Sequence, residues 1–167
     1  AASSLVVKKY PGAKSLIDIG GEDSKLVLFN NLKNPDIRMN GNCAGGTGAY
    51  IDQMAALLNV SIAELNNLAW QSSKIYPIAS RCGVFAKTDI QNLVSRKINT
   101  ADIAASIFEA AAGQIINTLA RGCSIEPEIL FCGGPLTYIS YLRESFSRIL
   151  KINKGNIIVP EHAELFT

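Results

Sequence analysis

Histidine is nearly missing from this chain of 167 residues, which has only His162. The four cysteines are Cys43, Cys82, Cys123 and Cys132, and no two of them have C-x-x-C spacing. A tetrahedral zinc site built by the chain alone is therefore not expected, because such a site needs four closely arranged thiolate or imidazole ligands. A metal bound here would take fewer than four of its ligands from one chain.

An excess of one charge and long apolar runs are missing too. The 16 basic and 14 acidic residues give a net charge of +2 and are spread along the chain, so no nucleic-acid partner is expected. The apolar stretches are short and interrupted, which predicts no membrane-spanning segment. Lys8 and Lys9 follow the first apolar stretch instead of preceding it, unlike in a signal peptide. We therefore expect a cytoplasmic protein with reduced cysteines.

What is present is enough apolar material, 48% of the residues, for one domain over 1–167. The pattern predicts a buried strand at 15–20, its hairpin partner at 25–30 and a third strand at 36–39. Helices are expected at 47–58, from Ser61 with a capping box to Glu64, at 84–97, from a Thr100 cap to Arg121, and at 138–150, with further strands at 75–79, 128–132 and 156–159. The order β-β-β-α-α-β-α-α-β-α-β fits an α/β, ribonuclease-H-like layer.

Two glycine-rich turns follow buried strands, where the ligands of open α/β sheets collect. At the first turn, the N–H groups near Gly20 and Gly21 could approach phosphate oxygens, and Asp18 could hold Mg²⁺ or orient water. An ordinary tight hairpin has the same residue types. The second turn, at 133–135, is either a platform for a nucleotide base or a plain connection from strand to helix.

Cys43 and Cys82 each lie in a loop of small residues directly before a predicted helix. The positive end of a helix dipole lowers the pKa of a thiol and makes the thiolate a good ligand for a metal or cluster. The other possibility for a cysteine is a small buried hydrophobe, which is the role we expect for Cys123 and Cys132.

Four segments, in this order, resemble the motifs of the activators of 2-hydroxyacyl-CoA dehydratases and of the related ATP-binding subunits of benzoyl-CoA reductase. They are 17–25 (IDIGGEDSK), 42–48 (NCAGGTG), 80–86 (SRCGVFA) and 131–135 (FCGGP). The resemblance implies one ribonuclease-H-like lobe, the second of two, of the acetate-kinase/hsp70/actin fold, a mixed sheet flanked by helices. In that family ATP lies between the lobes, and two cysteines from each of two subunits hold one [4Fe–4S] cluster. ATP drives an electron from the cluster to a dehydratase or reductase.

Carried over residue by residue, the resemblance makes Cys43 and Cys82 the cluster ligands. It implies catalytic roles for Asp18, Glu22 and Asp23. ATP or ADP with Mg²⁺ would be bound by Gly20, Gly21, Ser24, Lys25, Gly45, Gly46, Thr47, Gly133 and Gly134. The implied partners are a second activase-like module or an identical subunit, a 2-hydroxyacyl-CoA dehydratase-like or reductase component, and an electron donor such as ferredoxin or flavodoxin.

The chain also departs from the family. It lacks the first phosphate loop, an Asp-x-Gly-Ser/Thr turn, and the helix of small residues that follows the last strand. Glu22 replaces a glutamine and Lys87 a glutamate of many small activators, as in large fused relatives with tandem modules. The lobe alone is therefore expected to be inactive. Two other functions stay open: a lobe of a sugar kinase of the N-acetylglucosamine type, which needs neither cysteine, and a non-catalytic ATP-sensing or assembly lobe.

Overall fold

A computed structural model describes residues 8–30, 34–40, 45–79 and 82–165. At its centre is a five-stranded sheet with the order β3-β2-β1-β4-β5. The strands are β1 (Ser15–Ile19), β2 (Ser24–Leu28), β3 (Asp36–Asn40), β4 (Ile129–Cys132) and β5 (Ile157–Ile158). The first three form an antiparallel meander, whereas β4 is parallel to β1 and β5 is parallel to β4. The mixed sheet that the sequence predicts is confirmed.

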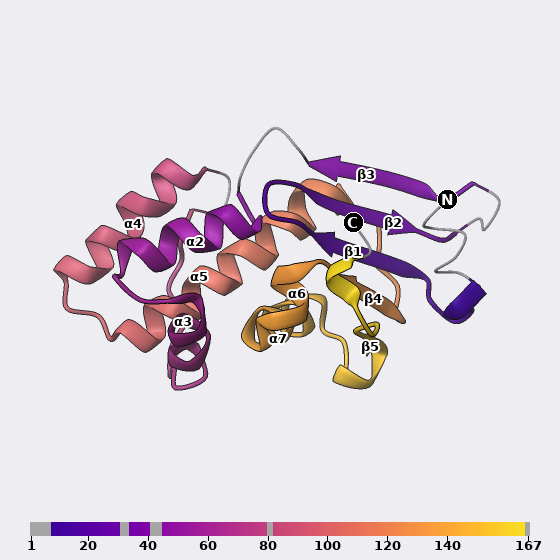
Figure 1. Ribbon diagram of the computed structural model, residues 1–167. Coiled ribbons are helices and arrows are strands. Elements are labelled where there is room, and N and C mark those ends of the chain that lie inside the picture. Colours follow the sequence, from indigo (N-terminus) through magenta and orange to yellow (C-terminus); the bar gives the residue numbers. More distant parts are fainter. Residues whose placement is uncertain (1–7, 31–33, 41–44, 80–81, 166–167) are drawn as a thin grey trace.

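After β3, β4 and β5 the chain forms helices. They are α2 (Gly48–Leu57), α3 (Ile62–Ala69), α4 (Gly83–Ser95), α5 (Thr100–Ile115), α6 (Gly134–Tyr138) and α7 (Ser140–Leu150), with the π-helical η1 (Ile116–Ala120) and the short 3-10 helices η2 (Lys154–Asn156) and η3 (Ala163–Leu165). In Figure 1, α6 and α7 lie beside β1 and β4, whereas α2, α3 and α4 extend away from the sheet. Helix α5 runs between these two parts of the molecule.

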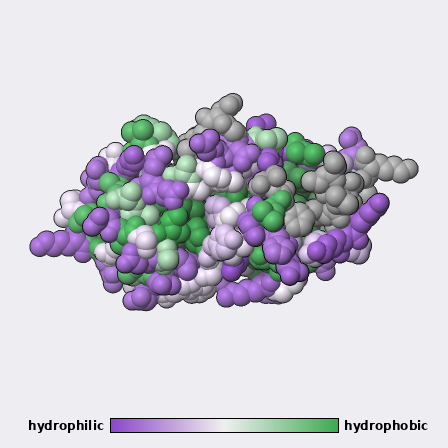
Figure 2. All heavy atoms as spheres, viewed as in Figure 1, coloured by the Kyte–Doolittle hydropathy of each residue, from purple (hydrophilic) through white to green (hydrophobic). Residues whose placement is uncertain are grey.

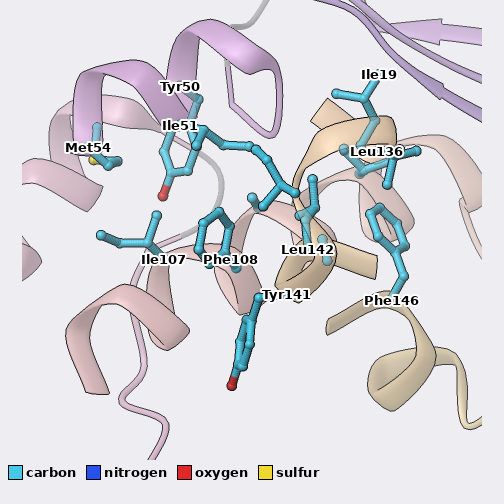
Figure 3. Packing of buried hydrophobic residues seen from close by; sticks show 14 of the residues in the cluster. Ile19, Tyr50, Ile51, Met54, Ile107, Phe108, Leu136, Tyr141, Leu142 and Phe146 are labelled. Atoms are coloured by element: carbon cyan, nitrogen blue, oxygen red, sulfur yellow. The ribbon is translucent and has the colours of Figure 1, made fainter. Parts of the chain in front are cut away.

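All five residues of β1 are buried. Because successive side chains of a strand point to opposite sides, the sheet is covered on both faces at β1. Ile17 and Ile19 belong to the large core shared with the helices, and Leu16 belongs to a smaller cluster on the opposite face. Figure 3 shows Ile19 next to Leu136 of α6 at one side of the large core, and Ile51 of α2 at its middle. The central position of β1 in this core fixes the place where the chain leaves the strand toward its first glycine turn.

Two helix starts can be compared with their predicted caps. Helix α3 begins as predicted, because the Ser61 hydroxyl accepts the N–H of Glu64 at 3.2 Å and the Glu64 carboxylate accepts the N–H of Ser61 at 2.8 Å. The predicted cap of α5 is wrong by one residue. The side chain of Asn99 accepts the N–H of Ala101 at 3.0 Å, so Thr100 is the first helical residue.

The long helix predicted to reach Arg121 is not regular over its whole length. Its α-helical part ends at Ile115, η1 follows, and Arg121 ends the element with a φ of +47°. The stretch Thr100–Ala120 is long and apolar enough to cross a membrane, but 72% of its most apolar window is buried inside the protein. Its apolar character is that of a core helix.

The strand predicted at 75–79 is wrong. This segment pairs with none of the five strands that the structure describes. Its backbone is held by helix side chains, since the N–H of Tyr76 donates to the hydroxyl of Ser106 at 2.8 Å and the N–H of Ala79 donates to Asp89 at 2.8 Å. The sequence also missed α6, and the helix predicted at 138–150 begins at Ser140.

Candidate functional site

The two predicted glycine turns meet at one edge of the sheet. They follow β1 and β4, which are parallel neighbours, so their carboxyl ends lie side by side. Gly133 has a φ of +88°, and a Cβ atom there would overlap the carbonyl oxygen of Ile19. Only glycine fits a position that combines this backbone conformation with such a close approach. The turns at Gly20 and Gly133, which are more than a hundred residues apart in sequence, therefore form one site.

Asp18 lies at the edge of this site, inside β1. Its side chain is 6% exposed, and its Oδ2 atom is 3.8 Å from the Nζ atom of Lys25. The other oxygen, Oδ1, is buried without a hydrogen-bond partner among the described residues. Burial raises the pKa of this carboxyl, and the positive charge of Lys25 lowers it by less. An unpartnered buried oxygen costs free energy, and a bound cation, water or ligand is what relieves such a cost in proteins.

The rest of the turn from β1 to β2 combines a fixed backbone with exposed charge. The N–H of Gly20 donates to the carbonyl oxygen of Asp23 at 2.9 Å. Lys25 also pairs with the Asp23 carboxylate at 3.2 Å. Glu22 is exposed at the tip, whereas Ser24 is buried and its hydroxyl finds no partner within the described part of the chain. Asp18 and Ser24 thus place next to the turn two oxygens that have no hydrogen-bond partner among the described residues.

Helix α2 starts directly on this turn. The N–H of Gly48 donates to the carbonyl oxygen of Gly20 at 3.0 Å, and the N–H of Ala49 donates to that of Gly21 at 2.7 Å. A Cβ atom on Gly48 would lie 3.2 Å from the Gly20 oxygen and 3.3 Å from the Cγ atom of Pro135. Gly48 is therefore the point where both turns and α2 touch. Sequence reasoning missed it, because nothing in the local pattern tells which later glycine packs on the first turn.

The predicted ligand-binding residues of the loop before α2 have a different environment. Gly45, Gly46 and Thr47 are all buried. Gly46 has a φ of +86°, and a Cβ atom there would lie 2.7 Å from the Cγ1 atom of Ile115 and 3.1 Å from the carbonyl oxygen of Ala111. The close contact of Gly46 is thus with α5. The predicted contact of this loop with a nucleotide stays a prediction.

A cavity of about 270 Å³ opens between the two turns and α2. Its walls are mainly apolar and are formed by Gly21, Gly48, Ile51, Asp52, Ile62, Gly134, Pro135, Tyr138 and Ile139. Tyr138 is 72% exposed at its rim. A pocket with apolar walls next to a polar turn suits a ligand that has a flat ring at one end and charged groups at the other. A larger cavity of about 650 Å³, between the segment 70–75 and α7, has none of the predicted site residues in its wall.

Cys82 is placed as the sequence predicts, at the N-terminus of a helix. It is the residue before α4 and is partly exposed. The N–H groups of Phe85 and Val84 lower the pKa of its thiol. Phe85 and Val84 are themselves 66% and 70% exposed, and Figure 2 shows an apolar patch over this part of α4, at the upper left of the molecule. Cys43 lies outside the described residues.

The two remaining cysteines differ from each other. Cys132 is buried in β4, as predicted, and burial raises the pKa of its thiol to about 12. Cys123 is exposed, so the prediction of a buried position is wrong. Its sulfur accepts a hydrogen bond from the Nη2 atom of Arg38 at 3.1 Å. Within the described ranges, no three His, Cys, Asp or Glu side chains are grouped so that they could hold a metal ion.

Known proteins resemble this chain in sequence and in fold. Residues 4–164 match the model of the BadF/BadG/BcrA/BcrD ATPase family. The chain is 34% identical, over 125 residues and 75% of its length, to the (R)-2-hydroxyglutaryl-CoA dehydratase activating ATPase of Acidaminococcus fermentans. The crystal structure of component A of that organism's (R)-2-hydroxyglutaryl-CoA dehydratase matches 99% of this chain with a TM-score of 0.87 at 28% identity. The activator of the 2-hydroxyisocaproyl-CoA dehydratase from Clostridium difficile, with bound ADPNP, also matches 99%, with a TM-score of 0.85 at 28% identity.

The chain spans only part of each relative. It covers 48% of the length of the activating ATPase, and 62% and 60% of the two solved chains. Within that span the fold is shared almost completely. The predicted fold, a ribonuclease-H-like lobe of the actin-like ATPase superfold, is confirmed.

Proposed function

The chain belongs to the BadF/BadG/BcrA/BcrD ATPase family, and from that membership we propose that it is the nucleotide-binding lobe of an ATP-dependent activator. The partner that this activator would reduce is a 2-hydroxyacyl-CoA dehydratase or a related CoA-ester reductase. The observation that carries the proposal is the packing of the two glycine turns against each other and against Gly48 at the start of α2, in a fold whose solved relative binds ADPNP. In this proposal the chain is the second of two lobes, and the nucleotide lies between them.

The residues of the site suggest how the nucleotide would be held. Its phosphates would be bound by backbone N–H groups of the turn at Gly20 and Gly21. Asp18, whose Oδ1 atom has no partner among the described residues, would hold Mg²⁺ or the water bound to it. The apolar cavity beside Pro135 and Tyr138 would receive the base. Glu22 and Asp23 would complete the polar side of the site.

The thiol of Cys82 fits an iron–sulfur ligand, because its lowered pKa favours the thiolate, which is the form that binds iron. Cys43 is proposed as the second ligand on the basis of its matching loop. Two cysteines from each of two modules would supply the four thiolates of a [4Fe–4S] cluster. The cluster, when bound, supplies one-electron transfer at low potential. The positive N-terminus of α4 would stabilise its negative charge.

The experiment that tests this function uses the full-length protein under anaerobic conditions. After reconstitution with iron and sulfide we expect about four irons per pair of modules, and a visible spectrum that changes when Mg-ATP is added. Cys82→Ser should lower the iron content. Cys123→Ser, which replaces an exposed cysteine hydrogen-bonded to Arg38, should leave the iron content unchanged.

The same samples separate the two other functions. A protein that binds no iron but phosphorylates N-acetylglucosamine would be a kinase of the same superfold. A protein that binds Mg-ATP, but neither iron nor sugar, would be a non-catalytic sensing or assembly lobe. Either result would replace the proposed function.

A further inference from the structure

The first turn of α2 is capped by the carbonyl groups of the predicted phosphate turn. The first N–H groups of any α-helix have no partner inside the helix and need one from outside. In α2 those of Gly48 and Ala49 donate to Gly20 and Gly21, at 3.0 and 2.7 Å. The start of α2 is therefore held by the same backbone that would bind phosphate.

The carbonyl groups that cap α2 and the N–H groups that would bind phosphate belong to the same peptide groups and lie on opposite sides of them. A peptide group is planar and rigid, so the carbonyl of Gly20 and the N–H of Gly21 move together, as do the carbonyl of Gly21 and the N–H of Glu22. The N–H of Gly20 is already used by Asp23. Those of Gly21 and Glu22 make no hydrogen bond with any described residue. A phosphate that rotates either peptide group toward itself must therefore also move a carbonyl oxygen that accepts a hydrogen bond from the first turn of α2.

At Gly48, helix α2 and the glycine turns are packed too closely for a larger side chain. A Cβ atom on it would lie 3.2 Å from the Gly20 oxygen, 3.2 Å from the Cα atom of Gly21 and 3.3 Å from the Cγ atom of Pro135. Two of these three atoms belong to backbone, which cannot turn aside as a flexible side chain does. The spacing between α2 and both glycine turns is thus set by the missing side chain of Gly48.

We propose that Gly48 is a positioning residue, through which occupancy of the phosphate turn is transmitted to the N-terminus of α2. This inference rests on the proposed function, since it needs a nucleotide at the turn. The loop that immediately precedes α2 in the chain leads back to Cys43. In the sequence, Gly48 is the fifth residue after Cys43, and in the structure it touches the nucleotide turn.

The chain offers a matched control for this position. Gly83 is the first residue of α4, as Gly48 is of α2, but a Cβ atom on Gly83 would meet no atom of the described residues within 4 Å. In the full-length protein we expect Gly48→Ala to weaken the binding of Mg-ADPNP by about tenfold or more. Gly83→Ala should bind it like the wild type. Equal affinities of the two variants would overturn the inference.

A second measurement separates transmission from a merely structural defect. Amide hydrogen exchange of the wild-type segment 45–51 should change when Mg-ADPNP binds, because the N–H groups of Gly48 and Ala49 are bonded to the turn. In Gly48→Ala, at saturating nucleotide, this change should be lost. A purely destabilised variant would show it in full once saturated, which would refute the proposal.

The wild-type exchange experiment needs no variant, so it decides the question even if Gly48→Ala does not fold. If the wild type binds Mg-ADPNP and exchange in segment 45–51 stays the same, the inference fails and the proposed function stands. If the full-length protein binds no nucleotide, both are rejected.

Discussion

Asp18 and Lys25 face each other across β1 and β2 at 3.8 Å, and yet burial determines the pKa of the aspartate. Desolvation raises that pKa more than the lysine lowers it. One carboxylate oxygen has no partner among the described residues, and the lysine also pairs with Asp23 at 3.2 Å. The ionised form of Asp18 therefore costs free energy in the folded lobe, a cost that a bound divalent cation would offset.

Replacing Asp18 by asparagine should separate stability from function. In the folded state the pKa of Asp18 is raised above the ordinary value of 3.8, whereas the unfolded chain loses the proton near that value. Between these two pKa values the free energy of unfolding of the wild type therefore decreases as the pH rises. Asp18→Asn has no such loss, and at neutral pH we expect it to be at least as stable as the wild type. In the full-length protein it should bind Mg-ATP more weakly. Urea unfolding across this pH range and nucleotide titration are the measurements.

The stability control for this variant is Asp52→Asn, which changes an exposed aspartate of α2; it is not used for nucleotide binding, because Asp52 also lines the cavity proposed for the base. Its unfolding free energy at neutral pH should stay within about 0.5 kcal/mol of the wild type. If Asp18→Asn were strongly destabilised at neutral pH, the ionised carboxylate would be a stabilising group, contrary to its raised pKa.

Gly133 and Gly134 are neighbours with opposite tolerance for a methyl group. At Gly133 a Cβ would overlap the Ile19 carbonyl oxygen at a φ of +88°, whereas at Gly134 it would meet nothing within 4 Å. We expect Gly133→Ala to lower the free energy of unfolding by about 2–4 kcal/mol, and Gly134→Ala to change it by less than about 0.5 kcal/mol. Chemical denaturation of both variants checks this. Similar losses in both would show that the turns do not meet as described.

The sequence predicts correctly those elements whose stabilising contacts join residues close together in the chain. The box of Ser61 and Glu64 predicts the start of α3, because both of its hydrogen bonds join residues three positions apart. Short apolar runs on either side of a turn with two glycines predict β1 and β2 as a hairpin. The segment 75–79 has strand-like composition, but its N–H groups find Ser106 and Asp89, partners that no local pattern reveals.

Some residues of the candidate site could likewise be predicted from their neighbours in the sequence, and others could not. Asp18, Gly20, Gly133 and Cys82 could be proposed from their own turns, since each has a chemical reason within a few residues. Gly48 could not, because its importance comes from contacts with Gly20 and with Pro135, which only the folded chain brings together. The apolar wall at Tyr138 depends on α6, an element that the sequence pattern did not indicate.

Asp102 anchors the chain that leads into the mispredicted segment. Its carboxylate accepts the N–H groups of Ser73 at 2.7 Å and Lys74 at 3.0 Å, and the first of these is the main reason why its pKa is lowered. Asp102→Ala would leave both donors unpaired, and we expect a loss of about 1–3 kcal/mol in unfolding free energy at neutral pH. Because the folded pKa is below 3.8, this loss should shrink as the pH falls through it. A pH-independent difference would contradict the assignment.

Cys82 offers a test of its helix N-terminus that requires neither iron nor ATP. The N–H groups of Phe85 and Val84 lower its thiol pKa below the ordinary 9.0, so more thiolate is present at neutral pH. Because only the thiolate attacks iodoacetamide, the pH profile of Cys82 alkylation in the folded, iron-free protein should have its midpoint below that of the same cysteine in urea. Cys132, buried and with a pKa of about 12, should resist the reagent until the protein unfolds, which reports how much of the sample is folded. Coincident midpoints in the folded and unfolded chain would mean that the helix does not favour the thiolate, and the strongest structural reason for placing a cluster at Cys82 would be gone.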